Sequence, residues 1–282
     1  MDKALSIIIA CYNDIDVRKA VEAASFQTYV SKEIIVVDDG SNEATKEVIA
    51  SVKDKIDILI EQKNSGQSIA RNNGIKKATG NYILNWDSDD YFEPEFSEKA
   101  IPKFQEDEAI KIVTCKARRF DKKGTIDIFT PRGGKLEDFL FRNSALGSAM
   151  FKKTDWEACG GYEENLPILG FEDWEFYIQL LKSGGYAYVI PEILFHYQVR
   201  PDSTTAQIKS LKQEKYKHII LKHPEIYKAN FVGLIDDLFK RIEQKDREQL
   251  KIYKTKEWKA GKFLLSPFRF LKVLKQNLVP KK

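Results

Sequence analysis

Short apolar runs alternate with polar, helix-like segments along the first ninety residues of the chain. Four runs are apolar almost without interruption, which is typical of strands buried on both faces: Leu5–Ala10, Glu33–Val37, Ile56–Ile60 and Tyr82–Trp86. Helices are predicted between these runs, over about 16–28, 43–52 and Ser68–Ala78. This alternation predicts an α/β fold with a Rossmann-like, mostly parallel central sheet flanked by helices.

Polar side chains follow three of these strands at the point where each strand ends. The segments are Cys11 to Asp14, Asp38 to Ser41 and Asp87 to Asp90. Ligands of open α/β sheets bind beyond the carboxyl ends of the strands, so these segments should surround one site. Asp38 and Asp39 also have a simpler interpretation, because Asp-Gly is a strong turn signal.

The sequence lacks a glycine-rich phosphate-binding loop of either common type. A bound nucleotide would therefore need another partner for its phosphates, and the carboxylates of Asp87 and Asp89 suggest a divalent cation. Mg²⁺ and Mn²⁺ take oxygen ligands, and one or two carboxylates suffice where phosphates complete the coordination shell. We therefore predict Mn²⁺ or Mg²⁺ as the cofactor.

Composition narrows the class of protein further. Disorder is excluded for most of the chain, since 43% of the 282 residues are hydrophobic and 17 are Phe. The three cysteines, Cys11, Cys115 and Cys159, match neither a disulfide framework nor a four-ligand zinc site. A run of about 18 apolar residues is absent, so a membrane-spanning helix is not expected. A cytoplasmic protein is the resulting prediction.

A series of motifs in a fixed order then points to one family. They are Ser6 to Asn13, Val36 to Ser41, Asn64-Ser65-Gly66 with Ala70-Arg71-Asn72, Asp87 to Asp90, Gly147-Ser148-Ala149, Gly160-Gly161-Tyr162 and Glu172 to Glu175. In order and spacing they resemble the family 2 glycosyltransferases with a GT-A fold, of the bacterial cell-surface polysaccharide type. The resemblance covers about residues 4–200. Each motif alone is weak, but their order makes the set specific.

The resemblance implies a role for each matching residue. The implied nucleotide-binding residues are Ala10, Tyr12, Asp39, Arg71, Asp87 and Ser88. The first three of these would surround a uracil base and its ribose. Asp89 would contact the metal ion as the second acid of an Asp-x-Asp motif. Asp173 would be the catalytic base of an inverting enzyme, which removes the proton of the acceptor hydroxyl.

Five further positions leave alternatives open. His196 could complete the metal shell, or it could be a structural histidine. Glu172 could orient the site, or it could be an acid that the helix dipole favours at a helix N-terminus. Trp174 could line an acceptor groove, although such aromatic residues are more often part of the core. Arg200 and Ser203 could cover the diphosphate.

The expected domain organisation is a glycosyltransferase domain over residues 1–204 and a helical region over 205–282. Within the domain, about 1–108 would bind the nucleotide sugar and about 109–204 the acceptor. Residues 251–282 carry ten Lys or Arg and one acid, a net charge of +9, whereas the rest, with 36 basic and 41 acidic residues, has −5. A basic, apolar segment of this kind suits an anionic membrane surface, here the inner face of the plasma membrane. The alternative is a packed helix with solvated lysines.

The sequence thus predicts a metal-dependent inverting glycosyltransferase, a hexosyl- or hexosaminyltransferase. Its preferred donor would be a UDP-sugar and its acceptor a glycan or lipid-linked glycan in cell-surface polysaccharide biosynthesis. One alternative is a non-catalytic nucleotide-sugar-binding protein, which would be expected to lack the base or a metal ligand. The other is a nucleotidyltransferase on a similar sheet, which usually has a basic, glycine-rich phosphate loop. Nucleic acid is not an expected partner, because the body of the chain is acidic.

Overall fold

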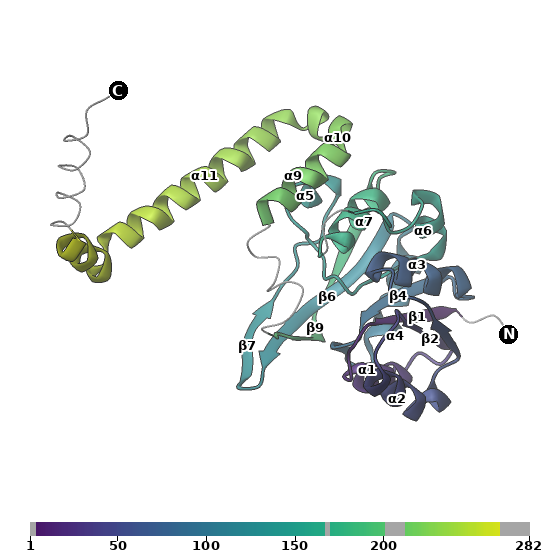
Figure 1. Cartoon of the computed structure of the whole chain (residues 1–282). Coiled ribbons are helices and arrows are strands. Elements are labelled where there is room, and N and C mark those ends of the chain that lie inside the picture. Colours follow the sequence, from purple (N-terminus) through teal and green to yellow (C-terminus); the bar gives the residue numbers. More distant parts are fainter. Residues whose placement is uncertain (1–3, 167–169, 201–211, 266–282) are drawn as a thin grey trace, which may run out of the picture. The chain divides into compact units, whose positions relative to one another are not determined.

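The computed structural model describes residues 4–166, 170–200 and 212–265, and the chain divides into two compact units, Met1–Lys222 and His223–Lys282 (Figure 1). The elements of the first unit are β1 (Leu5–Cys11), α1 (Val17–Ser25), β2 (Lys32–Asp38), α2 (Glu43–Ser51), the 3₁₀ turn η1 (Lys53–Lys55), β3 (Ile58–Glu61), α3 (Gln67–Lys77), β4 (Tyr82–Asp87), β5 (Tyr91–Phe92), α4 (Phe96–Glu106), β6 (Ile110–Asp121), β7 (Gly124–Phe129), α5 (Leu136–Phe139), β8 (Met150–Lys152), α6 (Lys153–Cys159), α7 (Glu172–Leu181), β9 (Tyr186–Gln198) and α9 (Lys212–Lys222). The second unit contains α10 (Pro224–Ala229) and α11 (Phe231–Lys254).

The first half of the first unit is the predicted alternation of strands and helices. Strands β3, β2, β1 and β4 lie in this order and run parallel. Successive side chains of a strand face opposite sides of the sheet. In β1, Ile7 and Ile9 join the core that includes residues of α1 and α4, whereas Ile8 contacts α3. Helices therefore cover both faces, which explains why β1 is apolar throughout.

Helix α3 packs very closely against β1. A Cβ atom on Gly74 would lie only 2.6 Å from Cγ2 of Ile8, so a larger residue would force a shift. The side chain of Asn72 ties the same helix to the segment after α6, because it bonds both backbone groups of Tyr162 and the indole nitrogen of Trp156. These contacts fix the turn of α3 that carries Arg71.

The sheet continues through β8, β6, β9 and β5 in mixed orientation. Strand β8 is antiparallel to both β4 and β6, whereas β6 and β9 are parallel. Strand β5 pairs antiparallel with β9, and β7 pairs antiparallel with β6 beyond the main path of the sheet. The α/β prediction is confirmed, with the antiparallel pairs gathered in this second half.

The second unit is helical, as expected for the C-terminal region. Helix α10 begins with Pro224 in its first turn, and Asn230 separates it from the 24-residue helix α11. Residues 256–265 are also helical. Within the described ranges, no helix combines the length and the apolar character needed to cross a bilayer.

The register of the parallel strands brings their polar ends to one edge of the sheet. Ala10 pairs with Asp87 of β4, and the next residue of β1, Cys11, pairs with Asp38 of β2. The backbone N–H of Asp39 donates to the carbonyl of Cys11 at 2.9 Å and continues this pairing. The candidate site is therefore built at the edge that the sequence indicated.

Candidate active site

Asp87 ends β4 and is paired with a buried arginine. The guanidinium of Arg71 donates to Oδ1 of Asp87 at 2.5 Å, and the Arg71 side chain is only 3% exposed. The same guanidinium lies 5.4 Å from the ring centre of Tyr162, which supplies a second favourable contact for the charge. A buried guanidinium needs such partners, since an unpaired buried charge is costly. The pair therefore fixes the carboxylate of Asp87 at the strand end.

Asp89 lies in a cluster of carboxylates that share one arginine. The guanidinium of Arg200 is 2.7 Å from Oδ2 of Asp89, 3.3 Å from Asp14 and 3.8 Å from Asp16. Burial first, and then the nearby charges of Asp87 and Asp14, raise the pKa of Asp89 to about 6, although Arg200 opposes the shift. The cluster therefore holds more negative charge than this arginine relieves.

Two further side chains of the cluster have structural partners. The hydroxyl of Ser88 donates to Oδ2 of Asp14 at 2.9 Å, so Ser88 links the ends of β4 and β1. Asp90 is 2% exposed, and its Oδ1 accepts the backbone N–H of Gln198 at 2.9 Å. Burial raises the pKa of Asp90 well above its usual range. Asp90 thus ties the turn between β4 and β5 to the end of β9.

His196 lies on β9, opposite Tyr91 of β5. Its Nε2 is 2.6 Å from Oε1 of Glu93, and its ring stacks on Tyr91 with a centroid distance of 4.4 Å. Its Nδ1 is buried, and within the described part of the chain it has no hydrogen-bond partner. These contacts are those expected of a structural histidine, and its role as a metal ligand stays a prediction.

The residues predicted to surround the base and its ribose lie at the ends of β1 and β2. The side chain of Tyr12 is half exposed, whereas Asp39 is buried. The carboxylate of Asp39 accepts the Nε2 group of Gln62 and the backbone N–H groups of Ser65 and Gly66 at 2.7 to 2.9 Å. Asp39 therefore organises the loop that leads into α3, and both Asp39 and Tyr12 stay predicted nucleotide ligands.

Asp173 lies in the first turn of α7, where the dipole of the helix favours negative charge. Its Oδ2 accepts the side-chain amide of Asn143 at 2.7 Å. Burial raises the pKa of Asp173 to about 6, with Arg71 opposing the shift and Glu172 adding to it. A carboxylate with a pKa of about 6 is half protonated near pH 6 and mostly ionised at neutral pH, so it can accept a proton there.

Asp173 and Asp87 both lie close to Gly147. A Cβ atom at Gly147 would lie 3.1 Å from Oδ2 of Asp173 and 4.0 Å from Oδ2 of Asp87. The two oxygens are therefore no farther apart than the sum of these distances. The structure thus brings the predicted base next to the acidic strand end, although 86 positions separate the two residues in sequence.

Glu172 and Trp174 are buried residues in the first turn of α7. Glu172 is buried, and its Oε2 accepts the backbone N–H of Gly170 at 2.6 Å. Trp174 is 4% exposed, its indole donates to the carbonyl of Phe139, and its ring stacks on Tyr216. Both have packing roles here, and their part in acceptor binding stays a prediction. Ser203 lies outside the described residues.

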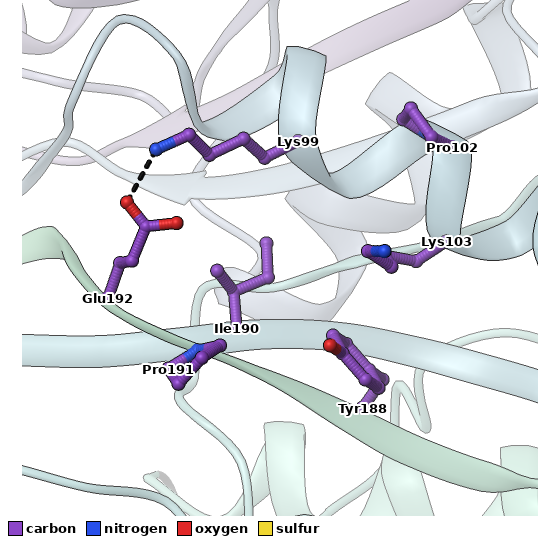
Figure 2. A pocket seen from close by; sticks show the side chains of 7 residues that line it. All are labelled: Lys99, Pro102, Lys103, Tyr188, Ile190, Pro191 and Glu192. Carbon is purple, nitrogen blue, oxygen red and sulfur yellow. Dashed lines mark hydrogen bonds and ion pairs between the residues drawn. The ribbon is translucent and has the colours of Figure 1, made fainter.

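A separate hollow of about 350 Å³ lies between α4 and β9. Lys99, Pro102 and Lys103 line its helix side, and Glu192 bonds Lys99 across it at 2.5 Å (Figure 2). The hollow contains none of the carboxylates of the strand ends. It is therefore distinct from the candidate active site.

Sequence comparison decides the family. The model of glycosyl transferase family 2 matches residues 6–152, which is more than half of the chain and includes every strand end of the site. The chain belongs to glycosyl transferase family 2. The predicted resemblance is thereby confirmed.

Two curated relatives show how far the likeness extends. The glycosyltransferase GlyA of Streptococcus pneumoniae is 38% identical over 116 residues, which are 39% of this chain and 17% of GlyA. The chondroitin synthase of Pasteurella multocida is 25% identical over 249 residues, which are 85% of this chain and 25% of the synthase. The family 2 chain therefore spans a quarter or less of the length of these relatives.

Solved structures confirm the GT-A fold. Staphylococcus aureus TarS 1–349 in complex with UDP-GlcNAc matches 72% of this chain and 60% of its own, with a TM-score of 0.59 and 17% identity. The mannosyltransferase PcManGT of Pyrobaculum calidifontis, in complex with GDP-Man and Mn²⁺, matches 92% of this chain and 83% of its own, with a TM-score of 0.58 and 15% identity. At such identities the likeness concerns the fold.

Proposed function

We propose that this chain is a metal-dependent inverting glycosyltransferase, which transfers a hexosyl or hexosaminyl group from a UDP-sugar to a glycan or lipid-linked glycan of the cell surface. The observation that carries the proposal is the approach of Asp173 to Asp87 across Gly147. Displacement at the sugar C1 needs a base on one side of the sugar and a stabilised diphosphate on the other. The nucleotide sugar would bind residues 1–108 and the acceptor residues 109–204.

The donor would lie over the ends of β1, β2 and β4. Tyr12 offers an exposed ring for the base, and Ala10 leaves room beside Asp87, its partner in the sheet. Arg71 carries positive charge toward the donor site, and Asp39, Asp87 and Ser88 supply oxygen atoms for the ribose. Neighbours named with UDP-GlcNAc and with GDP-Man support a nucleotide sugar, and the first supports UDP.

Asp89 fits a hard divalent cation such as Mn²⁺ or Mg²⁺. Its oxygens are the ligands these ions prefer, and the nearby carboxylates of Asp87 and Asp14 add negative charge that a cation would offset. Among the described residues, no three Asp, Glu, His or Cys side chains are arranged to hold a metal by themselves. We therefore assign one protein ligand, Asp89, with His196 as a second candidate, and the donor phosphates as the rest of the shell. When bound, the cation would act as a Lewis acid toward the departing diphosphate.

The residues of the chain then account for the movement of the proton. The acceptor hydroxyl gives its proton to Asp173, and its oxygen forms a bond to C1 of the sugar. The bond between C1 and the phosphate oxygen breaks, and its electron pair leaves with the diphosphate. The base and the leaving group lie on opposite sides of C1, so the configuration of the sugar inverts.

Calorimetry of the full chain tests the donor and metal assignments. UDP and GDP are titrated with and without Mn²⁺, and UDP is expected to bind in a Mn²⁺-dependent manner that Asp89→Asn abolishes. Asp173→Asn should keep this binding but lose the release of UDP from UDP-GlcNAc and other UDP-sugars. The control is Asp246→Asn, at an exposed position of α11. Metal-independent UDP binding, or a full rate in Asp173→Asn, would contradict the proposal.

The basic segment 251–282, called the basic tail below, is proposed to bind an anionic membrane surface. The helical residues 256–265 expose Trp258, Phe263, Leu264 and Leu265, and Phe263 is 78% exposed. Lysines 256, 259 and 262 lie in the same segment. Sedimentation with phosphatidylglycerol vesicles should be lost on charge reversal of these three lysines to Glu, but not on the same change at the exposed lysines 53, 122 and 123. Equal sedimentation of both variants would refute the membrane role.

A further inference from the structure

The carboxylate of Asp173 is held on one side by an asparagine from another part of the chain. Asn143 lies between α5 and β8, and its Nδ2 donates to Oδ2 of Asp173 at 2.7 Å. The Oδ1 atom of Asn143 accepts the backbone N–H of Ala145 at 3.2 Å. This second bond sets the orientation of the amide, since a flipped amide would turn its oxygen toward the carboxylate and leave that N–H without an acceptor.

The same oxygen of Asp173 lies beside residue 147, which is glycine. A Cβ atom there would lie 3.1 Å from Oδ2 of Asp173, tighter than ordinary van der Waals contact. The hydroxyl of Tyr177 donates to the carbonyls of Leu146 and Gly147 at 2.7 and 3.0 Å, which holds this backbone in place. Asp173, Asn143 and Gly147 therefore form one arrangement around a single oxygen atom.

We propose that Asn143 is the positioning residue of the catalytic base and that Gly147 keeps open the path by which the acceptor hydroxyl reaches Oδ2 of Asp173. The proposal rests on the proposed function of Asp173 as the base. A carboxylate oxygen has two lone pairs, so Oδ2 can accept the amide of Asn143 and still take the proton of a hydroxyl. The amide restricts the rotamer of Asp173 and favours its charged form.

Other charged groups also act on this carboxylate. Arg71 on α3 favours its charged form, whereas Glu172 beside it and Asp87 on β4 oppose it. The phenols of Tyr162 and Tyr177 lie close enough for Asp173 to raise their pKa values, and burial contributes most to that shift. Asn143 is a neutral member of this set, so its replacement by Ala removes a hydrogen bond without changing the net charge.

Carbon-13 NMR of the full chain, labelled at the aspartate carboxyl carbon, tests the proposal without a substrate. The signal of Asp173 is assigned by its absence in Asp173→Asn. In Asn143→Ala the pH midpoint of this signal should rise by about one to two units, because a hydrogen bond to a charged group is lost. Asn81→Ala, at an exposed turn, is the control and should leave the midpoint unchanged. An unchanged midpoint in Asn143→Ala would overturn the proposal.

Kinetics separates positioning from a purely structural role. In Asn143→Ala, kcat for UDP release from a UDP-sugar should fall by about 10- to 100-fold, with UDP affinity unchanged and the acid limb of the pH profile moved to higher pH. Loss of kcat with an unmoved limb and a lower Tm would instead assign Asn143 a structural role. An undiminished rate in Asp173→Asn would remove the base itself, which is a failure of the proposed function and not of this inference.

The glycine has its own test. Gly147→Ala should lose at least about tenfold in kcat while it retains UDP binding, because the added methyl group intrudes between Asp173 and Asp87. The backbone of Gly147 is not left-handed, so alanine is compatible with its conformation. The matched control is Gly261→Ala, where an added Cβ meets nothing within 4 Å. Equal rates for the two variants would overturn the role of Gly147.

Discussion

Replacing Arg200 with glutamine should make Mn²⁺ bind more tightly in the absence of nucleotide. In the structure the guanidinium of Arg200 contacts Oδ2 of Asp89 at 2.7 Å, and it also approaches Asp14 and Asp16. An ion that binds Asp89 must therefore displace or share this partner. Glutamine removes the positive charge and keeps a polar side chain, so the competition for the carboxylate is lost.

The size of the effect follows from the hydrogen bond that the ion has to replace. A hydrogen bond to a charged group contributes about 1.5–3 kcal/mol. The Arg200 side chain is 30% exposed, so solvent screening places the value at the low end. About 1.5 kcal/mol corresponds to roughly tenfold in Kd.

Isothermal titration of Mn²⁺ into the metal-free full chain measures this change directly. Arg18→Gln is the matched control, since Arg18 lies exposed on α1 and the substitution changes the net charge equally. A general charge effect would tighten Mn²⁺ binding in both variants alike. Unchanged or weaker Mn²⁺ binding in Arg200→Gln would refute the reasoning, because Asp89 would then not be the residue that takes the ion.

Three further predictions concern stability and pH. Arg71→Met leaves the largely buried Asp87 without its 2.5 Å partner, so the free energy of unfolding measured in urea should fall by about 3 kcal/mol. A decrease below about 1 kcal/mol would contradict the presence of a buried ion pair. The pKa values of Asp89 and Asp173 are about 6 in the folded chain, against an ordinary value of 3.8. Between pH 3.8 and 6 these two groups therefore bind more protons in the folded, metal-free chain than in the unfolded chain, and the free energy of unfolding should fall as the pH rises through this window. The Asp89→Asn variant should show a smaller dependence of this free energy on pH. Gly74→Ala should cost about 1–3 kcal/mol of stability, because its Cβ would lie 2.6 Å from Ile8, whereas Gly261→Ala should cost nothing in the same thermal unfolding assay.

The parts of the fold that follow from local pattern could be predicted from the sequence. Strands β1, β2, β3 and β4 are each found within a few residues of the apolar runs, because burial on both faces makes such runs continuous. The short strands β5 and β8, of two and three residues, could not be found in this way. Helix α4 was also missed, and it carries Pro102 in its interior, which argues against a helix when only the sequence is read.

The candidate site likewise contains residues that can be identified from the sequence and contacts that cannot. Residues at strand ends, such as Asp87 and Asp89, were named because the strand that precedes them is recognisable. Asp14 and Asn143 lie in loops, and their partners Ser88 and Asp173 are 74 and 30 positions away. No local periodicity connects such pairs, so their roles depend on how the sheet is assembled. The pairing of His196 with Glu93 is of the same kind, since it follows from the register of β5 and β9.

The charge balance at the strand ends is itself an argument for a ligand. Among the described residues, Asp14, Asp87 and Asp89 pair with the guanidinium groups of Arg71 and Arg200, and Arg71 is turned toward Asp87. Because the pKa of Asp89 is raised in the folded chain, the charged form of this carboxylate at neutral pH lowers the free energy of unfolding. Nothing in the packing of the sheet requires that cost, since neutral side chains could fill the same positions. A bound cation would remove it, and the cation would in turn attract the diphosphate of the donor to the side of the sheet that Asp173 faces.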